Sequence, residues 1–170
     1  MYEKTNWPER YDPRISPIYA LNDIDVKAPP SLVWKLLVDT LNWSSYFPPE
    51  NKIKILTGES ELTLGAICSR EVVGFPLTTT VTEFEPERRI SWSTVLDADH
   101  SNTAYHGWVI SPITGGCHVL TEETQQGSVF LEEIGRRNPG ALYRYHQQWV
   151  EDLARAAEAI SNNRSQFGAN

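Results

Sequence analysis

The clearest pattern of hydrophobic and polar positions lies near the C-terminus. Apolar and ring-bearing side chains recur there every three or four residues, at Leu142, His146, Trp149, Leu153, Ala156 and Ile160. This spacing places them on one face of a helix. Asn138 and Pro139 come before the pattern, and we expect them to be the N-cap and the first residue of the helix. The predicted helix has about 23 residues and is roughly 35 Å long.

Between residues 51 and 124 the pattern changes to short runs separated by turn residues. The runs are rich in β-branched and aromatic residues: NKIKILTG, GAICSREVV, LTTTVTEFE, RRISWSTVL, TAYHGWVIS and GCHVLTEET. Such runs are typical of strands, and EPER (85–88) and SPITGG (111–116) are typical of hairpin turns. The order predicts an antiparallel meander of six strands.

The segments before the meander predict one further strand and two helical pieces. The strand is expected at 16–26, the first helix at 28–39, and a shorter helical piece at 41–47 that ends at Pro48. One amphipathic helix cannot cover both faces of a seven-stranded sheet, so we expect the sheet to curl around the C-terminal helix. This predicts an α+β domain over residues 15–162, with an irregular arm at 1–14 and a flexible tail at 163–170.

Composition excludes several classes of partner. The net charge is −7, and lysine and arginine form no cluster beyond pairs, which argues against nucleic-acid binding. No apolar run approaches the roughly 18 residues of a membrane span, and the first residues have no apolar segment like that of a signal peptide. We therefore expect a cytoplasmic protein. Cys68 and Cys117 are too few for a disulfide framework or a zinc knuckle, and no metal or cofactor motif is present, so neither group is expected.

The segment HGWVISPITGGCHVLTEE (106–123) decides which polar side chains share a face. If residues 112–115 form the loop, Ser111 pairs with Gly116 and His106 lies opposite Thr121. Side chains alternate along a strand, so His106 shares a face with Thr121 and Glu123, whereas His118 points to the other face. A metal site made of His106 and His118 is therefore not expected. In this register His106 and Glu123 are diagonal neighbours about 7–8 Å apart.

The face that carries His106 is expected to be concave and to form a pocket with the long helix. The candidate catalytic residues are His106, Glu123 and His146, because imidazole and carboxyl groups in an apolar pocket suit proton transfer. Each also has a structural interpretation, such as a buried histidine hydrogen-bonded to Thr121. The expected ligand contacts are Trp92, Trp108, Thr121, Tyr143 and Trp149, with Trp43, Tyr46 and Phe47 at the mouth.

Five segments together carry a family resemblance. They are VKAPPSLVWKLLVDTLNWSSYF, VVGFP, TEFEPERRISWS, HGWVISPITGGCHVLTEETQQG and WVEDLARAAEAI. With the order of elements, they resemble the SRPBCC superfamily, and within it the polyketide cyclase/dehydrase-like branch, over roughly residues 18–162. The resemblance implies a helix-grip fold with a ligand cavity. It implies no particular catalytic residue, because the superfamily includes aromatase/cyclases, START lipid-transfer domains, pollen-allergen-like carriers and chaperone co-activators.

Three functions follow as hypotheses. The first is a cofactor-independent cyclase or dehydratase acting on a polyketide-like or other polycyclic metabolite by positioning and acid/base help. The second is a non-catalytic carrier or sensor of a hydrophobic metabolite, which would use the same groups to orient its ligand. The third is a protein-binding module. It is the weakest hypothesis, because such a module needs an exposed partner surface and the sequence has no apolar patch outside the core pattern. The six tryptophans and seven tyrosines favour a small apolar or aromatic ligand, and the chain is expected to be a monomer or homodimer.

Overall fold

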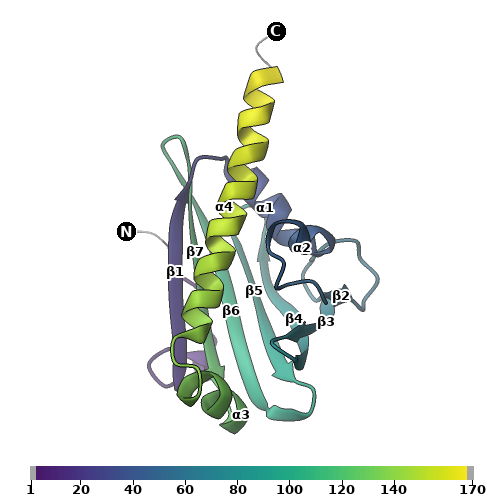
Figure 1. Cartoon of the computed structure of the whole chain (residues 1–170), viewed down its shortest axis with the longest axis vertical. Helices are drawn as coiled ribbons and strands as arrows, with labels where there is room; N and C mark the ends of the chain where they lie inside the picture. Colours follow the sequence, from purple (N-terminus) through teal and green to yellow (C-terminus); the bar gives the residue numbers. More distant parts are fainter. Residues whose placement is uncertain (1–2, 168–170) are drawn as a thin grey trace.

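The computed structural model describes residues 3–167 and contains one sheet, one long helix and several short helical pieces (Figure 1). The strands are β1 (Ile18–Val26), β2 (Lys54–Ile55), β3 (Ile67–Val72), β4 (Phe75–Glu85), β5 (Arg89–Leu96), β6 (Asp99–Ile113) and β7 (Gly116–Gln126). The helical elements are η1 (Glu9–Tyr11), α1 (Pro30–Val38), η2 (Thr40–Asn42), α2 (Trp43–Tyr46), α3 (Ser128–Phe130), the π-helical segment η3 (Leu131–Arg136) and α4 (Ala141–Phe167). No helix in this described range is long and apolar enough to cross a membrane.

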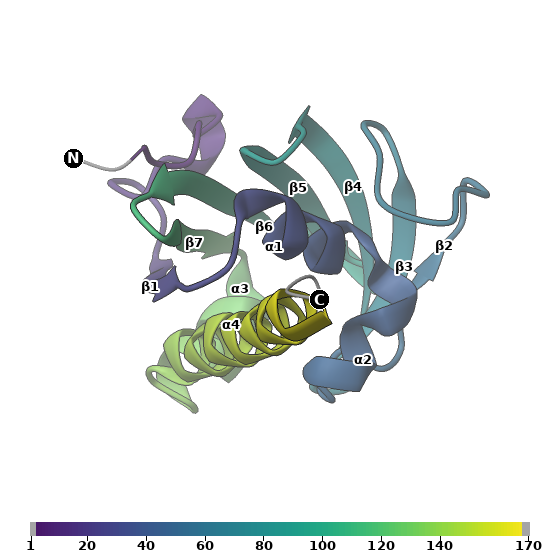
Figure 2. The same cartoon turned by 90° about the horizontal axis from the view of Figure 1, so that it is seen from above.

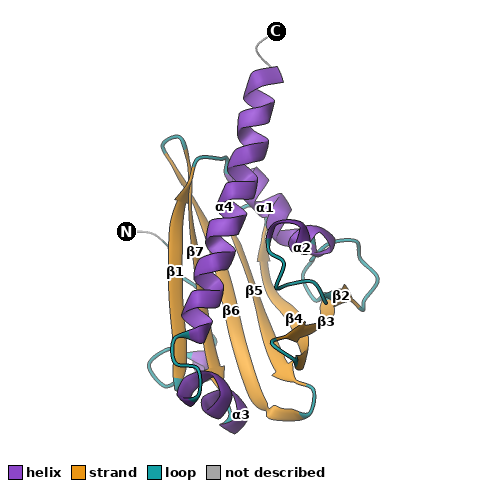
Figure 3. Ribbon diagram, in the orientation of Figure 1, coloured by secondary structure: helices purple, strands orange, loops and turns teal. Residues whose placement is uncertain are grey.

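The sheet has seven antiparallel strands in the order β1-β7-β6-β5-β4-β3-β2. Seen from above, it bends into an arc, and α4 lies across the concave side (Figure 2). The helices α1 and α2 cover the same side beside α4 (Figure 3). This is the predicted helix-grip fold, and the prediction is confirmed.

The main core lies between the concave face and the helices. From α4 it receives Trp149, Val150, Leu153, Ala154 and Ala157, and from α1 it receives Val33 and Leu37. These α4 positions recur at helical spacing, so one stripe of the helix faces the sheet over its whole buried length. The predicted stripe therefore identifies the side of α4 that packs on the sheet.

The start of α4 differs from the prediction. The helix begins at Ala141, two residues after Pro139, because Gly140 has a φ of +76° and interrupts the helical path. Asn138 does not act as the expected N-cap: its side-chain amide donates to the Glu133 carbonyl at 2.9 Å, within the preceding segment. At the other end, residues 163–167 continue α4, and the rest of the predicted tail lies outside the described residues.

The β6–β7 hairpin also differs from its predicted register. Ile113 pairs with Gly116, which leaves a two-residue turn at Thr114 and Gly115, and Gly115 has a φ of +83°, which glycine adopts without strain. His106 therefore lies directly opposite Glu123, and the predicted pairing of His106 with Thr121 is wrong by two residues. Because the error is even, each side chain still points to the predicted face.

The N-terminal arm lies against the convex face of the sheet. The Thr5 backbone N–H donates to Glu122 Oε2 at 3.0 Å, and Trp7 contacts the rings of Tyr19 and Tyr105. Tyr11 stacks on Tyr105 with ring centroids 5.3 Å apart. Residues 102–110 of β6 and 117–125 of β7 are consequently buried without interruption, since the helices cover one face and the arm covers the other.

A Gly107→Ala substitution tests this packing. A Cβ atom at position 107 would lie 2.3 Å from Thr5 Cγ2 and 2.5 Å from Thr5 Oγ1, so the arm or the strand must move. We expect the free energy of unfolding, measured by urea denaturation, to fall by about 1–3 kcal/mol. The double variant Thr5→Gly/Gly107→Ala removes the clashing atoms and should recover part of this loss. Equal stability of Gly107→Ala and the unmodified chain would contradict the packing described.

Candidate functional site

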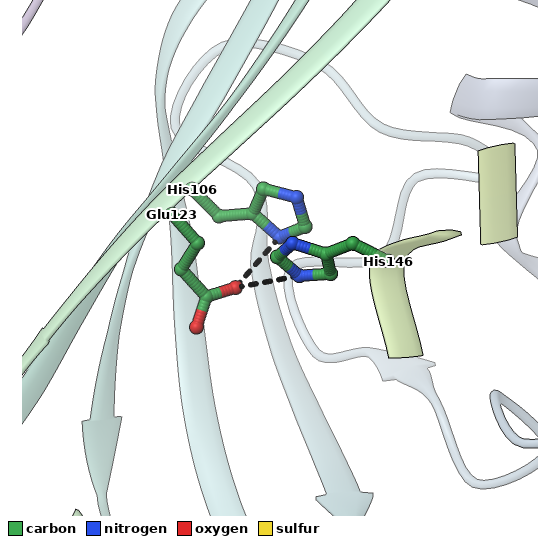
Figure 4. A group of neighbouring side chains, drawn as sticks. All are labelled: His106, Glu123 and His146. Carbon is green, nitrogen blue, oxygen red and sulfur yellow. Dashed lines mark ion pairs between the residues drawn. The ribbon is translucent and has the colours of Figure 1, made fainter. Parts of the chain in front are cut away.

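Three titratable side chains from three different elements meet beside the concave face (Figure 4). His106 on β6 and Glu123 on β7 are a directly opposed pair, and His146 reaches them from α4. His106 Nδ1 lies 3.0 Å and His146 Nε2 3.2 Å from the same oxygen, Glu123 Oε2. The three residues are only 2%, 9% and 1% exposed. The structure thus brings together all three residues that the sequence analysis nominated for catalysis.

Two further side chains hold this cluster in place. The Thr121 hydroxyl lies 2.6 Å from His106 Nε2, and the Gln125 side-chain amide donates to Glu123 Oε1 at 2.7 Å. An ionised carboxylate only accepts hydrogen bonds, so the imidazole nitrogens that face Glu123 donate to it. The Thr121 hydroxyl lies between His106 Nε2 and the Gly107 carbonyl, which is 3.2 Å from Thr121 Oγ1. Glu123 then accepts three hydrogen bonds, and His106 has both ring nitrogens paired.

The pKa values of the cluster agree with this proton arrangement. Burial lowers the pKa of His106 to about 4, and the positive charge that His146 would carry acts in the same direction, against the opposing effect of Glu123. Burial raises the pKa of Glu123, but the charges and hydrogen bonds of His106 and His146 outweigh it and hold that pKa well below its usual value. At neutral pH the cluster therefore contains an ionised carboxylate and a neutral His106.

His146 differs from His106 in having one unpaired nitrogen. Its Nε2 faces Glu123, whereas Nδ1 is buried and has no hydrogen-bond partner among the described residues. A carboxylate that fixes one imidazole nitrogen leaves the lone pair on the other, as in the arrangement that activates a histidine as a general base. His146 Nδ1 is therefore the free basic atom of the cluster.

A cavity of about 110 Å³ lies next to the cluster. His106, Glu123 and His146 form part of its wall, and most of the remaining wall is apolar. That apolar wall includes Phe75, Leu77, Phe130, Ile134, Leu142 and Trp149. The cavity is thus bounded by β4, the segment from α3 to η3, and the first turns of α4.

Arg70 on β3 also lines the cavity, and the sequence analysis did not identify it. Its Nε and one terminal nitrogen bond both carboxylate oxygens of Glu50, and the Tyr145 hydroxyl donates to Glu50 Oε1 at 2.7 Å. Arg70 and Glu50 are both buried, so this is an ion pair removed from water. A signal was present in the sequence: Arg70 follows Cys68 at the strand spacing of two, which places a charge on the core-facing side of β3.

Of the predicted ligand contacts, Trp149 is the one that lines the cavity. Thr121 contacts His106 and does not itself line the cavity. The remaining predicted contacts do not line it either. Trp43, Phe47, Trp92 and Trp108 are packed in the core, the Tyr46 hydroxyl donates to the Leu36 carbonyl, and Tyr143 is 50% exposed. Ligand contact by these residues stays a prediction.

The same three polar side chains could hold a metal ion. One donor atom each of His106, Glu123 and His146 lies within 4.8 Å of the others, and two imidazoles with one carboxylate are a donor set of catalytic zinc. The pair considered from the sequence, His106 with His118, does not form such a site, because His118 lies on the other face with its Nδ1 2.7 Å from Asp25 Oδ1. The expectation of no metal stays a prediction, which treatment with a chelator tests.

Comparison with solved structures supports the fold. A hypothetical protein from Helicobacter pylori is 22% identical, with a TM-score of 0.85 over 92% of this chain and 98% of that one. A protein of the dynemicin biosynthetic locus is 17% identical, with a TM-score of 0.61 over 84% of this chain and 48% of that one. Ara h 8.0201 is 11% identical, with a TM-score of 0.62 over 84% of this chain and 98% of that one.

Sequence comparison gives the family. A search of curated proteins found no significant match. The family model described as polyketide cyclase/dehydrase and lipid transport matches residues 22–158, which is most of the sheet, the cavity wall and α4. The chain therefore belongs to the polyketide cyclase/dehydrase and lipid transport family of the SRPBCC superfamily.

Proposed function

We propose that the chain is a cofactor-independent enzyme of the cyclase or dehydratase type that acts on a small, largely apolar carbonyl compound. One observation carries the proposal. The buried cluster of His106, Glu123 and His146 forms part of the wall of an otherwise largely apolar cavity, and one imidazole nitrogen in it is unpaired. Buried polar groups are usually paired, so an unpaired basic nitrogen beside a cavity suits a group that acts on a ligand.

The chemistry begins with removal of a proton next to the substrate carbonyl. His146 Nδ1 accepts that proton, and Glu123, which faces Nε2, stabilises the resulting imidazolium. His106 keeps Glu123 in position through its Nδ1–H, and these two residues together with His146 form the acid/base corner of the site. The low polarity of the surrounding wall strengthens the attraction between the carboxylate and the imidazolium.

Completion of the reaction returns the same proton. In a dehydration, the imidazolium of His146 protonates the departing hydroxyl group, which leaves as water while the carbon–carbon double bond forms. In an aldol-type cyclisation, the enolate carbon attacks a second carbonyl, and the proton goes to the new alkoxide. Both reactions balance without a redox partner, and acid/base help of this kind contributes about 10²–10⁴-fold to the rate.

A non-catalytic carrier or sensor of a hydrophobic metabolite is the second candidate. It is favoured by the wall of the cavity, in which apolar side chains predominate. In a carrier, the cluster would only orient the ligand, so substitutions in it would alter affinity but there would be no turnover to lose.

Substitution of the cluster separates these functions. His106→Ala and Glu123→Gln should each lower turnover at least ~10-fold, because each removes part of the acid/base corner. Turnover is measured by nuclear magnetic resonance as exchange of the protons next to the carbonyl of small ketones in deuterium oxide, and circular dichroism checks the fold. His118→Gln is the matched control, since His118 is a buried histidine on the opposite face of the same strand pair.

Two outcomes would contradict the proposal. Near-normal exchange in both cluster variants would remove His106 and Glu123 from the mechanism. Loss of exchange after treatment with a chelator, followed by recovery on addition of zinc, would show that the reaction depends on a metal ion.

A further inference from the structure

The cavity is small compared with the ligands first expected from the sequence. Its volume is about 110 Å³. An apolar cavity of about 150 Å³ in another protein holds one benzene molecule, whereas pockets for drug-sized molecules have roughly 300–1,000 Å³. A fused polycyclic molecule exceeds this volume, whereas one ring or a short chain fits within it.

A packed group of aromatic side chains prevents the cavity from extending into the core. Trp149 forms the wall on that side and stacks on Phe47, with ring centroids 4.9 Å apart and an angle of 13° between the rings. Trp43 and Trp108 each contact Trp149 in an edge-to-face arrangement, with ring centroids 5.0 Å and 5.2 Å from that of Trp149. All four side chains are essentially inaccessible to solvent. Protein interiors packed in this way do not open for an additional ring without loss of many contacts.

Arg70 supplies a hydrogen-bond donor in the wall. Glu50 occupies its Nε and Nη2 atoms, and among the described residues no acceptor faces the other terminal nitrogen, Nη1. A guanidinium N–H group without a protein acceptor, on a residue that lines the cavity, is available to donate to an oxygen of a ligand there. The donor and the acid/base corner line the same small space.

The charges of the wall select against anions. Glu50 already neutralises Arg70, and Glu123, ionised at neutral pH, is part of the same wall. A carboxylate in the cavity would be repelled by Glu123 at short distance without a free cation to balance it. A neutral carbonyl oxygen accepts a hydrogen bond from Arg70 without this repulsion.

We infer that this cavity selects a neutral carbonyl compound with a single ring or a short chain, that Trp149 sets the size limit and that Arg70 binds the carbonyl oxygen. The inference rests on the proposed function in taking this cavity as the ligand site, and it replaces the polycyclic ligand expected from the sequence by a compound with one ring or a short chain.

The size limit is tested by measuring, with calorimetry, the affinity of the chain for three ketones: cyclohexanone, a two-ring decalone and a three-ring ketone. Cyclohexanone should bind at least 10-fold more tightly than either larger ketone. In the Trp149→Phe variant, which removes one ring from the wall, the decalone should gain at least 5-fold relative to cyclohexanone. Tighter binding of the larger ketones by the unmodified chain, an unchanged ratio in the variant, or no binding of any of the three would overturn the size limit.

The role of Arg70 is tested with ligands of similar shape: cyclohexanone, methylcyclohexane and cyclohexanecarboxylate. The ketone should bind at least 5-fold more tightly than the hydrocarbon and more tightly than the carboxylate. The double variant Arg70→Met/Glu50→Gln removes both charges together and so leaves no unpaired buried ion. It should bind ketone and hydrocarbon within 2-fold of each other. Preference for the carboxylate, or a ketone preference that survives in the double variant, would overturn the assignment.

Binding and turnover are read separately in these experiments. Selective binding of cyclohexanone without exchange of its protons would support the inferred ligand class and count against the proposed enzyme. Exchange on larger ketones would support the enzyme and overturn the inferred size limit.

Discussion

Replacement of Arg70 by methionine is expected to lower the free energy of unfolding by about 3–5 kcal/mol. The substitution leaves Glu50 as a buried carboxylate, 2% exposed, with the Tyr145 hydroxyl as its remaining hydrogen-bond donor. A charge that has lost its partner in the interior retains the full penalty of removal from water. Urea denaturation followed by circular dichroism measures the change.

The double variant Arg70→Met/Glu50→Gln separates the buried charge from other effects. Replacement of both ions by neutral groups of similar size is often nearly neutral, so the double variant should be more stable than Arg70→Met alone. If the two variants were equally destabilised, the loss would come from packing of the arginine side chain, and the account given for the ion pair would be wrong.

Truncation of Trp149 to alanine is expected to lower the free energy of unfolding by a similar amount, about 3–5 kcal/mol. The indole is fully buried and contacts the rings of Trp43, Phe47 and Trp108. Its removal exposes those rings to an empty space that the surrounding strands and helix cannot close. The same denaturation assay applies.

Two variants on α4 serve as controls for Trp149→Ala. Trp149→Phe keeps an aromatic ring and should cost clearly less. Tyr143→Ala, at an exposed position of the same helix, should change stability by no more than about 0.5 kcal/mol. A loss at Tyr143 as large as that at Trp149 would mean that helix propensity, and not burial of the indole, determines the effect.

The fold was predictable because its two strongest signals are periodic. The stripe on α4 and the β-rich runs before it are local patterns, and together they require a sheet that curves around one helix. The start of α4 was not predictable to the residue, because Asn138 and Pro139 are ordinary helix-start residues and only the positive φ of Gly140 excludes them. The hairpin register failed for a related reason, since SPITGG contains enough turn residues for both a four-residue and a two-residue loop.

The candidate site was predictable where strand alternation or helix spacing was sufficient. His106 and Glu123 share a face in any register shifted by an even number, and His146 lies on the apolar stripe of α4. The pairing of Arg70 with Glu50 was not predictable, because 20 residues separate them and no local rule joins them. Neither strand alternation nor helix spacing separates a tryptophan that fills the core from one that lines a cavity, as Trp108 on β6 and Trp149 on α4 show.

The N-terminal arm supports the candidate site from behind. Thr5 rests on Gly107 and hydrogen-bonds Glu122, and these two residues are the chain neighbours of His106 and Glu123. The same short stretch of β6 and β7 is therefore clamped between the arm on one side and α4 on the other. A tag, fusion or protease cut near Thr5 would release this clamp, and its effect would appear on the far side of the sheet, as a change in the spacing of two side chains that the arm never touches.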